Sequence, residues 1–534
     1  MKNIFILLLF VSFASKATDP YKRNPAIDIK HYTFQLEVND STNIITGKAS
    51  ILILFKKSIA DFELDLANKN SSGQGMDVAS VLLNGKPLFF EHQNDKLRII
   101  FKDLPSANEQ LTFEINYQGI PQDGFIIGKN KFDDRCFFGD NWPDRGHQWL
   151  PTIDHPSDKS AVDFIVIAPL HYSVVANGIK IEESFLDPKR KLTHWYEEVP
   201  IPVKVMVVGI ARFAVQYVGK VDDISIQSWV YPQNRAEGFY DYAVAVKVLD
   251  YFHRHIGPYS YKKLANVQSK TRWGGLENAN TIFYFENSVN GKGDHEGLIA
   301  HEEAHQWFGN SASENDWHHV WLSEGFATYF TNLYLEYAYG HDRLVEEQIK
   351  DRDEAINYFQ KNPAPVVDTT IMDIGKVLST NTYQKGGWVL HMLRHELGDN
   401  DFWKGIRQYY STYRNSNAMT LDFKRIMEEV SGKNLAVFFD QWLYKGGHPK
   451  LAATWQYDSK LKELKLEVQQ TQKGPYFHFP LEILITNKIG KKETKTVKIE
   501  SQQSKFAIKV DFEPTELILD PATWLLYEGT IQKK

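Results

Sequence analysis

The feature that most constrains the fold is a pair of histidines, His301 and His305, followed after residues 306–323 by Glu324. Side chains four residues apart on a helix lie about 40° apart around its axis, so both imidazoles can bind one ion. A carboxylate from a second helix would complete a set of two histidines and one glutamate, leaving a fourth zinc position open for water. Such an open position distinguishes a catalytic zinc from a structural one. Glu302 lies on the same side of the helix as His305, where it can face that water as general base.

The sequence around these ligands favours two helices. The first is predicted from residue 297 to Gly309, where glycine can stop a helix. The second, apolar and aromatic, is predicted from about residue 321 to residue 337 and carries Glu324. A His-Glu-x-x-His sequence also arises by chance on ordinary surface helices. The two-helix context makes the metal site the better interpretation.

Length and composition describe a large globular protein. The chain has 534 residues, 43% hydrophobic and 24% charged, which predicts about three domains. Its net charge of −6, with both signs mixed along the chain, gives no reason to expect nucleic-acid binding. The single cysteine, Cys136, excludes an intrachain disulfide and is predicted to be a small buried residue rather than a reactive thiol.

Residues 1–17 have the pattern of a secretory signal peptide. Lys2 supplies a positive charge, residues 4–13 are an apolar stretch, and Ala17 is a small residue at the end. The apolar stretch is too short to span a membrane, and no later run is long and apolar enough to do so. The alternative is a buried N-terminal strand. We therefore expect an exported protein without a membrane span, either periplasmic or fully secreted.

Residues 18–220 are predicted to form an N-terminal β domain. Apolar and polar residues alternate from residue 31 to residue 38 and again over 111–117, which is typical of strands with one buried face. The polar stretch 68–75 marks one break in this pattern. Asn84-Gly85 marks a second and is the stronger hairpin signal.

Residues 221–447 are predicted to form the catalytic domain, which is mostly helical after a strand at 224–231. Besides the two metal helices, its predicted helices cover 236–256, 344–359, 383–397, 402–413 and 423–430. The sequence Gly446-Gly447-His448-Pro449 is a strong break. Residues 448–534 then return to short strands, predicted at 462–468, 480–486, 494–500, 505–511 and 517–527, which fit a small β-sandwich. The predicted fold class is multidomain α+β.

Two further segments could bind and orient a substrate. Gly274-Gly275-Leu276-Glu277-Asn278 precedes a β run, and paired glycines there allow close backbone approach by a ligand. Tyr383-Gln384-Lys385-Gly386-Gly387 opens an apolar helix. Alone, neither is specific, because paired glycines usually mark a turn and most tyrosines are packing residues.

Taken together, these motifs resemble the gluzincin family of zinc aminopeptidases, which includes membrane alanyl aminopeptidase and the bifunctional leukotriene hydrolase. The order and spacing of the motifs agree with the family over most of the chain after residue 17. The matching segments are 301–310 (HEEAHQWFGN), 321–327 (WLSEGFA), 274–278, 383–386, and Trp149-Leu150-Pro151 with Asp154-His155-Pro156. The implied catalytic domain is thermolysin-like.

The resemblance implies catalytic roles for five residues. His301, His305 and Glu324 are expected to bind one Zn²⁺ per chain. Glu302 is expected to activate the bound water and to carry its proton to the leaving amine. Tyr383 is expected to donate a hydrogen bond to the oxyanion.

The resemblance also implies a substrate-binding group. Glu277 is expected to hold the α-ammonium of the substrate, and a carboxylate at a fixed distance from zinc would confine cleavage to the first peptide bond. The backbone of Gly274 and Gly275 is expected to pair with the extended substrate as an added strand. Asn278, at the end of the same motif, is assigned to this group.

The sequence departs from the family pattern at several places. Leu276 stands where methionine is usual, a near match in volume. Ser323 replaces a common asparagine, which is expected to alter hydrogen bonds around the ligands. The chain ends without the long C-terminal helical domain that covers the site in many members, so a more open cleft is expected. For the glutamine or glutamate with which the N-terminal domain helps to bind the ammonium, residues 138–141 are the best candidate.

We therefore expect a monomeric zinc aminopeptidase that hydrolyses the first peptide bond of peptides with a free N-terminus. Three alternatives on the same zinc site stay open. An open cleft would allow an endopeptidase. An epoxide hydrolase is disfavoured because the C-terminal helical domain is missing. A non-catalytic peptide-binding protein is disfavoured because all three ligands and the base are present.

Overall fold

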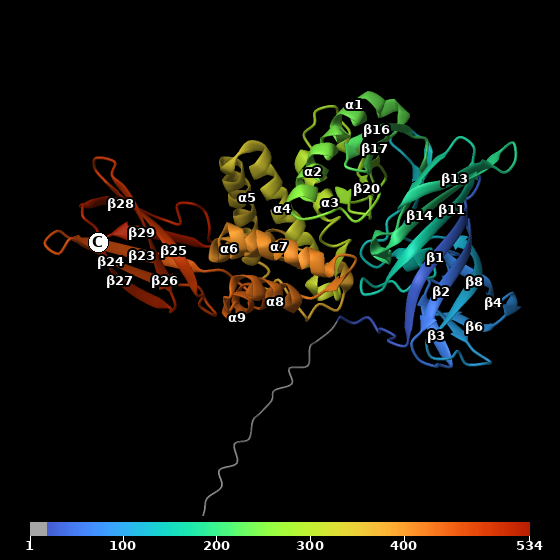
Figure 1. The fold of residues 1–534 in the computed structure, drawn as a ribbon, viewed down its shortest axis with the longest axis horizontal. Coiled ribbons are helices and arrows are strands. Elements are labelled where there is room, and N and C mark those ends of the chain that lie inside the picture. The colour runs from blue at the N-terminus through green and yellow to red at the C-terminus, as the bar shows by residue number, and fades with distance from the viewer. Residues whose placement is uncertain (1–18) are drawn as a thin grey trace, which may run out of the picture.

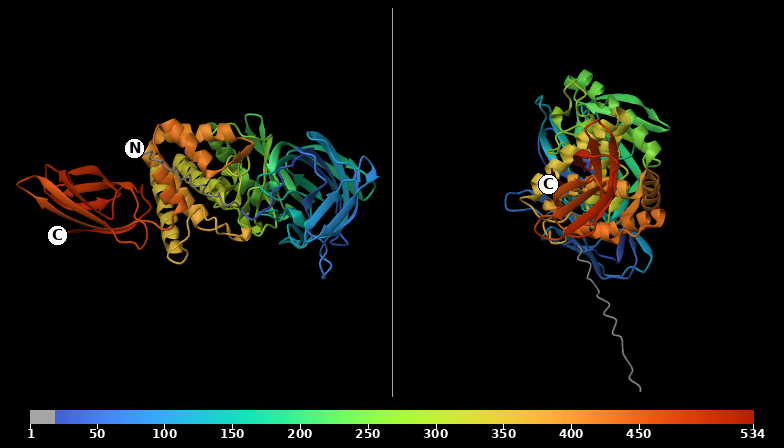
Figure 2. Two further views of the ribbon diagram at one scale, coloured as in Figure 1. Left: turned by 90° about the horizontal axis from the view of Figure 1, so that it is seen from below. Right: turned by 90° about the vertical axis from the view of Figure 1, so that its left-hand side faces the viewer.

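The computed structural model describes residues 19–534, so the predicted signal peptide lies outside the described residues. Three regions follow one another in a row: an N-terminal β region, a mainly helical middle region and a C-terminal β region (Figure 1). The left view of Figure 2 shows the same row from below, with the C-terminal β region projecting at one end, and the right view looks along the row from that end. The α+β class and this order of regions agree with the prediction.

The N-terminal region is built around an eight-stranded sheet in the order β13-β14-β11-β1-β2-β8-β4-β5. In β1 (Ile27–Glu37) the alternation seen in the sequence buries Tyr32, Phe34 and Leu36. Asn84 and Gly85 join β4 to β5 with φ values of 53° and 75°, as a tight hairpin turn of this kind requires. The other strands are β2 (Ile45–Phe55), β4 (Gly75–Leu83), β5 (Lys86–Pro87), β8 (Glu109–Ile120), β11 (Lys159–Pro169), β13 (Ile179–Phe185) and β14 (Arg190–Pro202).

Two smaller sheets complete this region. One has the order β3-β7-β6 and the other the order β12-β15-β10-β9. Cys136, on β10, is fully buried as predicted. The strands are β3 (Asp61–Asp65), β6 (Phe89–Gln93), β7 (Lys96–Ile100), β9 (Phe125–Lys129), β10 (Arg135–Gly139), β12 (Ser173–Ala176) and β15 (Val208–Ala211).

A five-stranded sheet, β16-β17-β18-β20-β19, opens the middle region. Its first two strands, β16 (Ala214–Val221) and β17 (Ile224–Val230), form a hairpin, and the boundary predicted at 220/221 falls inside that hairpin. The sheet therefore begins earlier in the chain than predicted. Its last strand, β19 (Gly275–Leu276), pairs only with β20 (Thr281–Tyr284), while β18 (Lys263–Gln268) lies on the other side of β20. β19 is thus an edge strand.

The helices of the middle region pack around α4 (Trp321–Tyr339), which contacts α3, α5 and α6. Most of α4 is buried because its residues are apolar or aromatic on every side. The predicted helix 236–256 is divided into α1 and α2 by the turn η4 (Tyr242–Val244). The helices are α1 (Arg235–Asp241), α2 (Ala245–His255), α3 (Glu296–Ala304), α5 (His341–Phe359), α6 (Gly386–Leu397), α7 (Asp399–Tyr413), α8 (Thr420–Ser431) and α9 (Ala436–Phe439), with π-helical turns η8 (Asn381–Lys385) and η9 (Asp440–Tyr444).

The first metal helix is shorter than predicted. α3 ends at Ala304 rather than at Gly309. The amides of Gln306 and Trp307 bond to carbonyls three residues back, which tightens the chain into a turn. Gly309 has a φ of 116°, outside the helical range, and lies in this turn rather than at the end of the helix.

The C-terminal β region contains two sheets, β27-β24-β23-β29 and β26-β25-β28. Strands β24 (Glu463–Gln470), β25 (Phe479–Asn487), β26 (Lys492–Ile499) and β27 (Gln503–Lys509) match predicted ones. The predicted strand 517–527 is wrong beyond Leu519, where β28 (Pro514–Leu519) ends and Asp520 adopts a positive φ. The prediction also missed β23 (Lys450–Asp458) and β29 (Glu528–Lys533), which pair in parallel.

The segment before β1 joins the N-terminal and catalytic regions. The carboxylate of Asp19 lies 2.8 Å from Nε2 of His155 and accepts a hydrogen bond from the amide of Trp317 at 2.9 Å. The amide of Asp19 in turn donates to Asp316 at 3.1 Å. Burial acts to raise the pKa of Asp316, but hydrogen bonds from His318 and from the Asp19 backbone outweigh it and lower that pKa to about 2.

Over residues 19–534, no helix is both long enough and apolar enough to cross a bilayer.

Candidate active site

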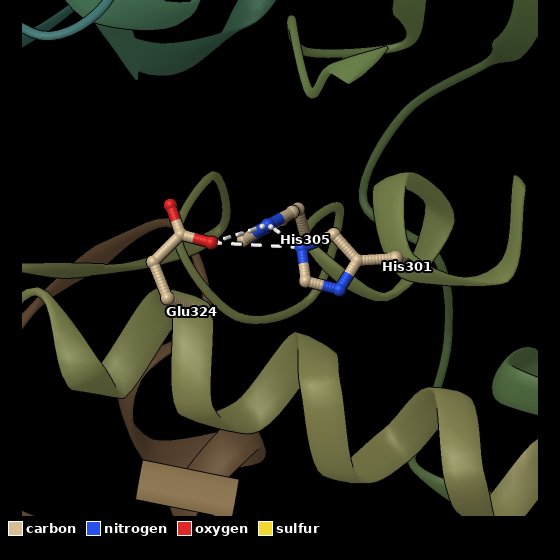
Figure 3. A group of neighbouring side chains, drawn as sticks. All are labelled: His301, His305 and Glu324. Atoms are coloured by element: carbon tan, nitrogen blue, oxygen red, sulfur yellow. Dashed lines mark hydrogen bonds and ion pairs between the residues drawn. The ribbon is translucent and has the colours of Figure 1, made fainter. Parts of the chain in front are cut away.

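Two adjacent helices bring the three predicted metal ligands together. His301 lies on α3, His305 caps its C-terminal end, and Glu324 lies in the first turn of α4 (Figure 3). The two Nε2 atoms are 3.2 Å apart, and Oε2 of Glu324 lies 3.5 Å from His301 Nε2 and 3.2 Å from His305 Nε2. Tetrahedral zinc with bonds of about 2.0–2.1 Å holds its ligands about 3.3 Å apart. The donor set therefore fits such an ion in both chemistry and spacing.

The charges within the trio also favour a cation. Burial lowers the pKa of the His301 imidazole, which keeps it neutral and able to bind a metal. Burial opposes ionisation of Glu324, but the neighbouring His305 and His301 outweigh it and lower its pKa, so the carboxylate is ionised. Burial likewise opposes a charge on His305, yet Glu324 raises its pKa. A positive charge is thus stabilised between these side chains, as a metal ion would be.

Neighbouring groups fix the orientation of His305. Its Nδ1 lies 3.2 Å from the carbonyl oxygen of Phe308 and 3.0 Å from Oγ of Ser323. Because a carbonyl can only accept, Nδ1 carries the proton and Nε2 is left free for a metal. Ser323 therefore supports a ligand from the position where the family commonly has asparagine. A Cβ added at Gly309 would lie 2.1 Å from this Oγ, so the loop approaches as closely as glycine permits.

Glu302 lies under the edge strand β19. Its side chain is buried, and a Cβ added at Gly275 would come within 2.2 Å of its Oε1. Glycine at position 275 is therefore required by the close approach of Glu302, whereas the sequence predicted room for the close approach of a ligand. Burial raises the pKa of Glu302 well above its ordinary value, which makes the carboxylate a stronger proton acceptor.

Glu277 follows β19, and its carboxylate interacts electrostatically with the imidazoles of His301 and His305. The residue is 5% exposed, and its Oε1 is buried with no hydrogen-bond partner among the described residues. Its backbone is held in place, because its carbonyl accepts from Gln306 Nε2 at 3.0 Å and from Asn310 Nδ2 at 2.5 Å. A fixed, buried carboxylate at a cleft, with one oxygen free of hydrogen bonds, is a binding site for a cationic group.

Tyr383 lies in the π-helical turn η8, which directly precedes α6 and contacts α4. Its ring is parallel to the imidazole of His301, with centroids 6.0 Å apart. Burial raises the pKa of Tyr383 well above its ordinary value, so the hydroxyl stays protonated and can act as a donor. A π-helical turn at a functional residue is a recurrent feature of proteins.

These residues line a cleft of about 400 Å³. Gly274, Gly275, Glu277, Glu302 and Tyr383 all contribute to it, together with the ligands His301 and Glu324. Asn278 does not: its side chain is fully buried and lies outside the cleft lining. The remaining lining residues, none of them predicted as site residues, are Trp142, Trp273, Leu276, Leu298 and Leu378.

Two segments of the chain match known protein domains. Residues 29–203 match the Peptidase M1 N-terminal domain, and residues 240–442 match the Peptidase family M1 domain. The chain belongs to the M1 peptidase family. This is a metallopeptidase family, in agreement with the resemblance found in the sequence.

Curated relatives of this M1 chain are aminopeptidases by name. "Probable aminopeptidase 2" of Sulfurisphaera tokodaii is 24% identical over 82% of this chain and 58% of its own length. Glutamyl aminopeptidase of Homo sapiens is 26% identical over 58% of this chain and 34% of its own length. "Aminopeptidase M1-C" of Oryza sativa is 27% identical over 60% of this chain and 38% of its own length. The chain thus spans less than two thirds of these relatives.

The structure places Trp142, rather than residues 138–141, at the cleft of this M1 chain. Asp140 is buried against Arg145, with Nε of Arg272 3.9 Å away, and Asn141 bonds to Trp149 at 2.8 Å. The polar side chains of the predicted segment, Asp140 and Asn141, therefore interact with other residues and do not line the cleft. In the sequence, the only signal for Trp142 was its position directly after that segment.

Proposed function

We propose that this M1 chain is a zinc aminopeptidase, which hydrolyses the first peptide bond of peptides with a free N-terminus. The observation that carries the proposal is the buried carboxylate of Glu277, whose Oε1 has no hydrogen-bond partner among the described residues, at the cleft beside His301, His305 and Glu324. An endopeptidase would have no use for a buried anion at this place, because an internal peptide nitrogen is uncharged.

The three ligands would hold one zinc ion in a catalytic region of the thermolysin type. When bound, the zinc supplies a Lewis acid that polarises a peptide carbonyl and lowers the pKa of water. The supporting contacts of His305 with Phe308 and Ser323 fix one ligand before the ion binds.

The protein's own residues then divide the remaining work. Glu277 binds the α-ammonium and so sets the first peptide bond at the metal ligands. Glu302 accepts a proton from the attacking water and passes it to the leaving amine. Tyr383 donates a hydrogen bond to the carbonyl oxygen as it gains negative charge. The free edge of β19 would offer backbone groups of Gly275 to an extended peptide. The carbonyl of Gly274 already accepts a hydrogen bond from the amide of Phe285 at 3.2 Å, so Gly274 would contribute its lack of a side chain rather than this carbonyl.

The same proposal includes the location, the oligomeric state and the zinc content of the enzyme. We infer export to the periplasm or the medium from the signal-like sequence of residues 1–17. One zinc ion per chain follows from the single trio of ligands found among the described residues, and the proposed enzyme is a monomer.

The test uses aminoacyl-arylamides with free and with acetylated N-termini. Cleavage of the free amines only, abolished by a chelator and restored by zinc, is the expected result. Cleavage of the acetylated compounds would instead support an endopeptidase. No cleavage of either, with zinc bound, would support a binding protein.

The variant Glu277→Gln tests the observation that carries the proposal, because it keeps the shape of the side chain and removes its charge. We expect KM for the free amines to rise and the preference over acetylated compounds to fall. An unchanged preference would remove Glu277 from the ammonium site.

A further inference from the structure

The cleft walls around the metal ligands are apolar and come from distant parts of the chain. Trp142 follows β10 of the N-terminal region, Trp273 precedes β19, and Leu276 belongs to β19. Leu298 belongs to α3, and Leu378 precedes η8. A side chain entering this cleft would therefore exchange water for two indoles and three leucines.

The charged groups that line the cleft are carboxylates. Apart from the ligand His301, they are the carboxylates of Glu277, Glu302 and Glu324. Within residues 19–534, no lysine or arginine contributes to this lining. A substrate side chain bearing a carboxylate would lose water beside these like charges, and no lysine or arginine of the lining would compensate for that loss.

The nearby cations are already engaged. Arg145 and Arg272 both pair with Asp123, and Arg145 also pairs with Asp140. Lys204 donates to Glu314 at 2.6 Å. None of these charges is free to recognise an acidic substrate.

The Trp142 wall is held from behind. The Nζ of Lys204 lies 5.6 Å from the ring centroid of Trp142, and Trp317 packs edge-to-face against it with centroids 5.5 Å apart. Trp142 itself is only 3% exposed. An indole fixed in this way presents a rigid apolar surface, which favours a substrate group that fits it without reordering the wall.

We propose that the cleft selects peptides whose first residue is large and apolar, with Trp142 as a specificity-determining residue supplied by the N-terminal region. This proposal rests on the proposed aminopeptidase function. This selection would disfavour a glutamyl first residue, because the cleft lining within residues 19–534 offers no lysine or arginine to bind a side-chain carboxylate. A cleft of about 400 Å³ is within the usual range for a small bound group, about 300–1,000 Å³.

The expected preference follows from burial of apolar surface. Each methylene group recognised in an apolar pocket changes kcat/KM by roughly ten-fold or more. Leucyl and phenylalanyl compounds should therefore exceed the alanyl compound by at least about ten-fold in kcat/KM. The glutamyl compound should fall below the alanyl one because of the carboxylates.

The experiment measures kcat/KM of the zinc-loaded full chain on leucyl-, phenylalanyl-, alanyl-, arginyl- and glutamyl-arylamides. Wild type is compared with Trp142→Ala and with the matched variant Trp142→Phe, which keeps an apolar ring. Leu378→Ala tests a second wall if Trp142→Ala does not fold, as judged from its melting temperature. Trp142→Ala should reduce the leucyl-to-alanyl ratio several-fold, and Trp142→Phe should largely restore it.

The outcomes separate the two proposals. If no free-amine compound is cleaved, the aminopeptidase function fails. If cleavage occurs but the glutamyl or arginyl compound is preferred, the function stands and the apolar selection is refuted. If folded Trp142→Ala has the wild-type leucyl-to-alanyl ratio of kcat/KM, Trp142 is not a specificity determinant. If Leu378→Ala also has the wild-type ratio, the proposal that the apolar cleft walls select the first residue is refuted.

Discussion

The buried ion pair between Lys204 and Glu314 allows a quantitative prediction. Lys204 follows β14 in the turn η2 (Val203–Val205), and Glu314 ends β21 (Ala312–Glu314) in the catalytic region. Their side chains are 1% and 0% exposed, and Nζ lies 2.6 Å from Oε1. Removing one partner leaves the other buried without compensation, which typically costs about 3–5 kcal/mol.

The electrostatic loss of unfolding free energy in each single variant cannot exceed the free energy needed to neutralise the partner that remains. In Lys204→Met, the ordinary pKa of glutamate lies about 2.7 units below pH 7, so protonating Glu314 costs up to about 3.7 kcal/mol. In Glu314→Leu, the ordinary pKa of lysine lies about 3.4 units above pH 7, so deprotonating Lys204 costs up to about 4.6 kcal/mol. Burial lowers the pKa of the neighbouring Lys159 to about 7, while Glu314 acts to raise it, so the loss of Glu314 also disfavours the charge on Lys159. We therefore expect Glu314→Leu to be the more destabilising change.

The two variants should respond to pH in opposite directions. A carboxyl whose pKa is raised by folding favours the folded state at low pH, so Lys204→Met should recover stability as pH falls. The cost of protonating Glu314 then has an upper bound of about 2.3 kcal/mol at pH 6, against about 3.7 kcal/mol at pH 7. A lysine whose pKa is lowered favours the folded state at high pH, so Glu314→Leu should recover as pH rises, to a bound of about 1.9 kcal/mol at pH 9.

The assay is urea unfolding of both single variants and of the double variant Lys204→Met/Glu314→Leu, followed by tryptophan fluorescence from pH 6 to pH 9. The double variant should cost less than either single change, because it leaves neither member of the pair behind. Additive costs of under about 1 kcal/mol each, or a shared pH trend, would refute the reasoning.

Four further predictions concern the site and its support. Glu302→Gln should abolish nearly all turnover while the bound zinc, measured by elemental analysis, stays at one per chain; substantial residual activity would exclude Glu302 as the base. Tyr383→Phe should lower kcat far more than it raises KM in steady-state kinetics, because the oxyanion exists only on the reaction path; an unchanged kcat would remove that role. Gly309→Ala should destabilise the protein by about 1–3 kcal/mol, because it adds backbone strain at φ 116° and crowds Ser323, and it should weaken zinc binding in a chelator competition; a neutral effect on both would contradict the geometry. Asp316→Asn should reduce the fall in melting temperature between about pH 4 and pH 2. Folding lowers the pKa of Asp316 to about 2, so its ionised carboxylate stabilises the protein fully above the ordinary pKa of aspartate, and this stabilisation is lost as pH falls toward 2. An acid-induced fall in melting temperature identical to that of wild type would refute the prediction.

The sequence predicted best what depends on local periodicity. Alternation placed Tyr32 and Phe34 in the core, and the four-residue spacing of His301 and His305 placed both imidazoles beside one carboxylate. These signals hold because each is a property of one strand or one helix turn.

What the sequence did not show depends on tertiary packing. The end of α3 was misplaced because the chain tightens into a turn after Ala304 rather than continuing the helical pattern to Gly309. Strand β29 was missed because its residues are polar and mostly exposed, and only its pairing with β23 makes it a strand. The position of Trp142 depends on a fold that brings it to Glu302, which lies far away in the chain, and no local pattern encodes that meeting.

The origin of Trp142 has a consequence for how enzymes of this architecture diversify. The predicted metal ligands and base lie within the segment that matches the Peptidase family M1 domain, whereas Trp142 lies within the segment that matches the M1 N-terminal domain. Recombination that joined the metal-bearing segment to a different N-terminal partner would preserve the hydrolytic chemistry and replace one face of the selecting surface. The catalytic residues and the residues that select the substrate can therefore be inherited separately. A change in substrate preference would then require no mutation of the metal ligands.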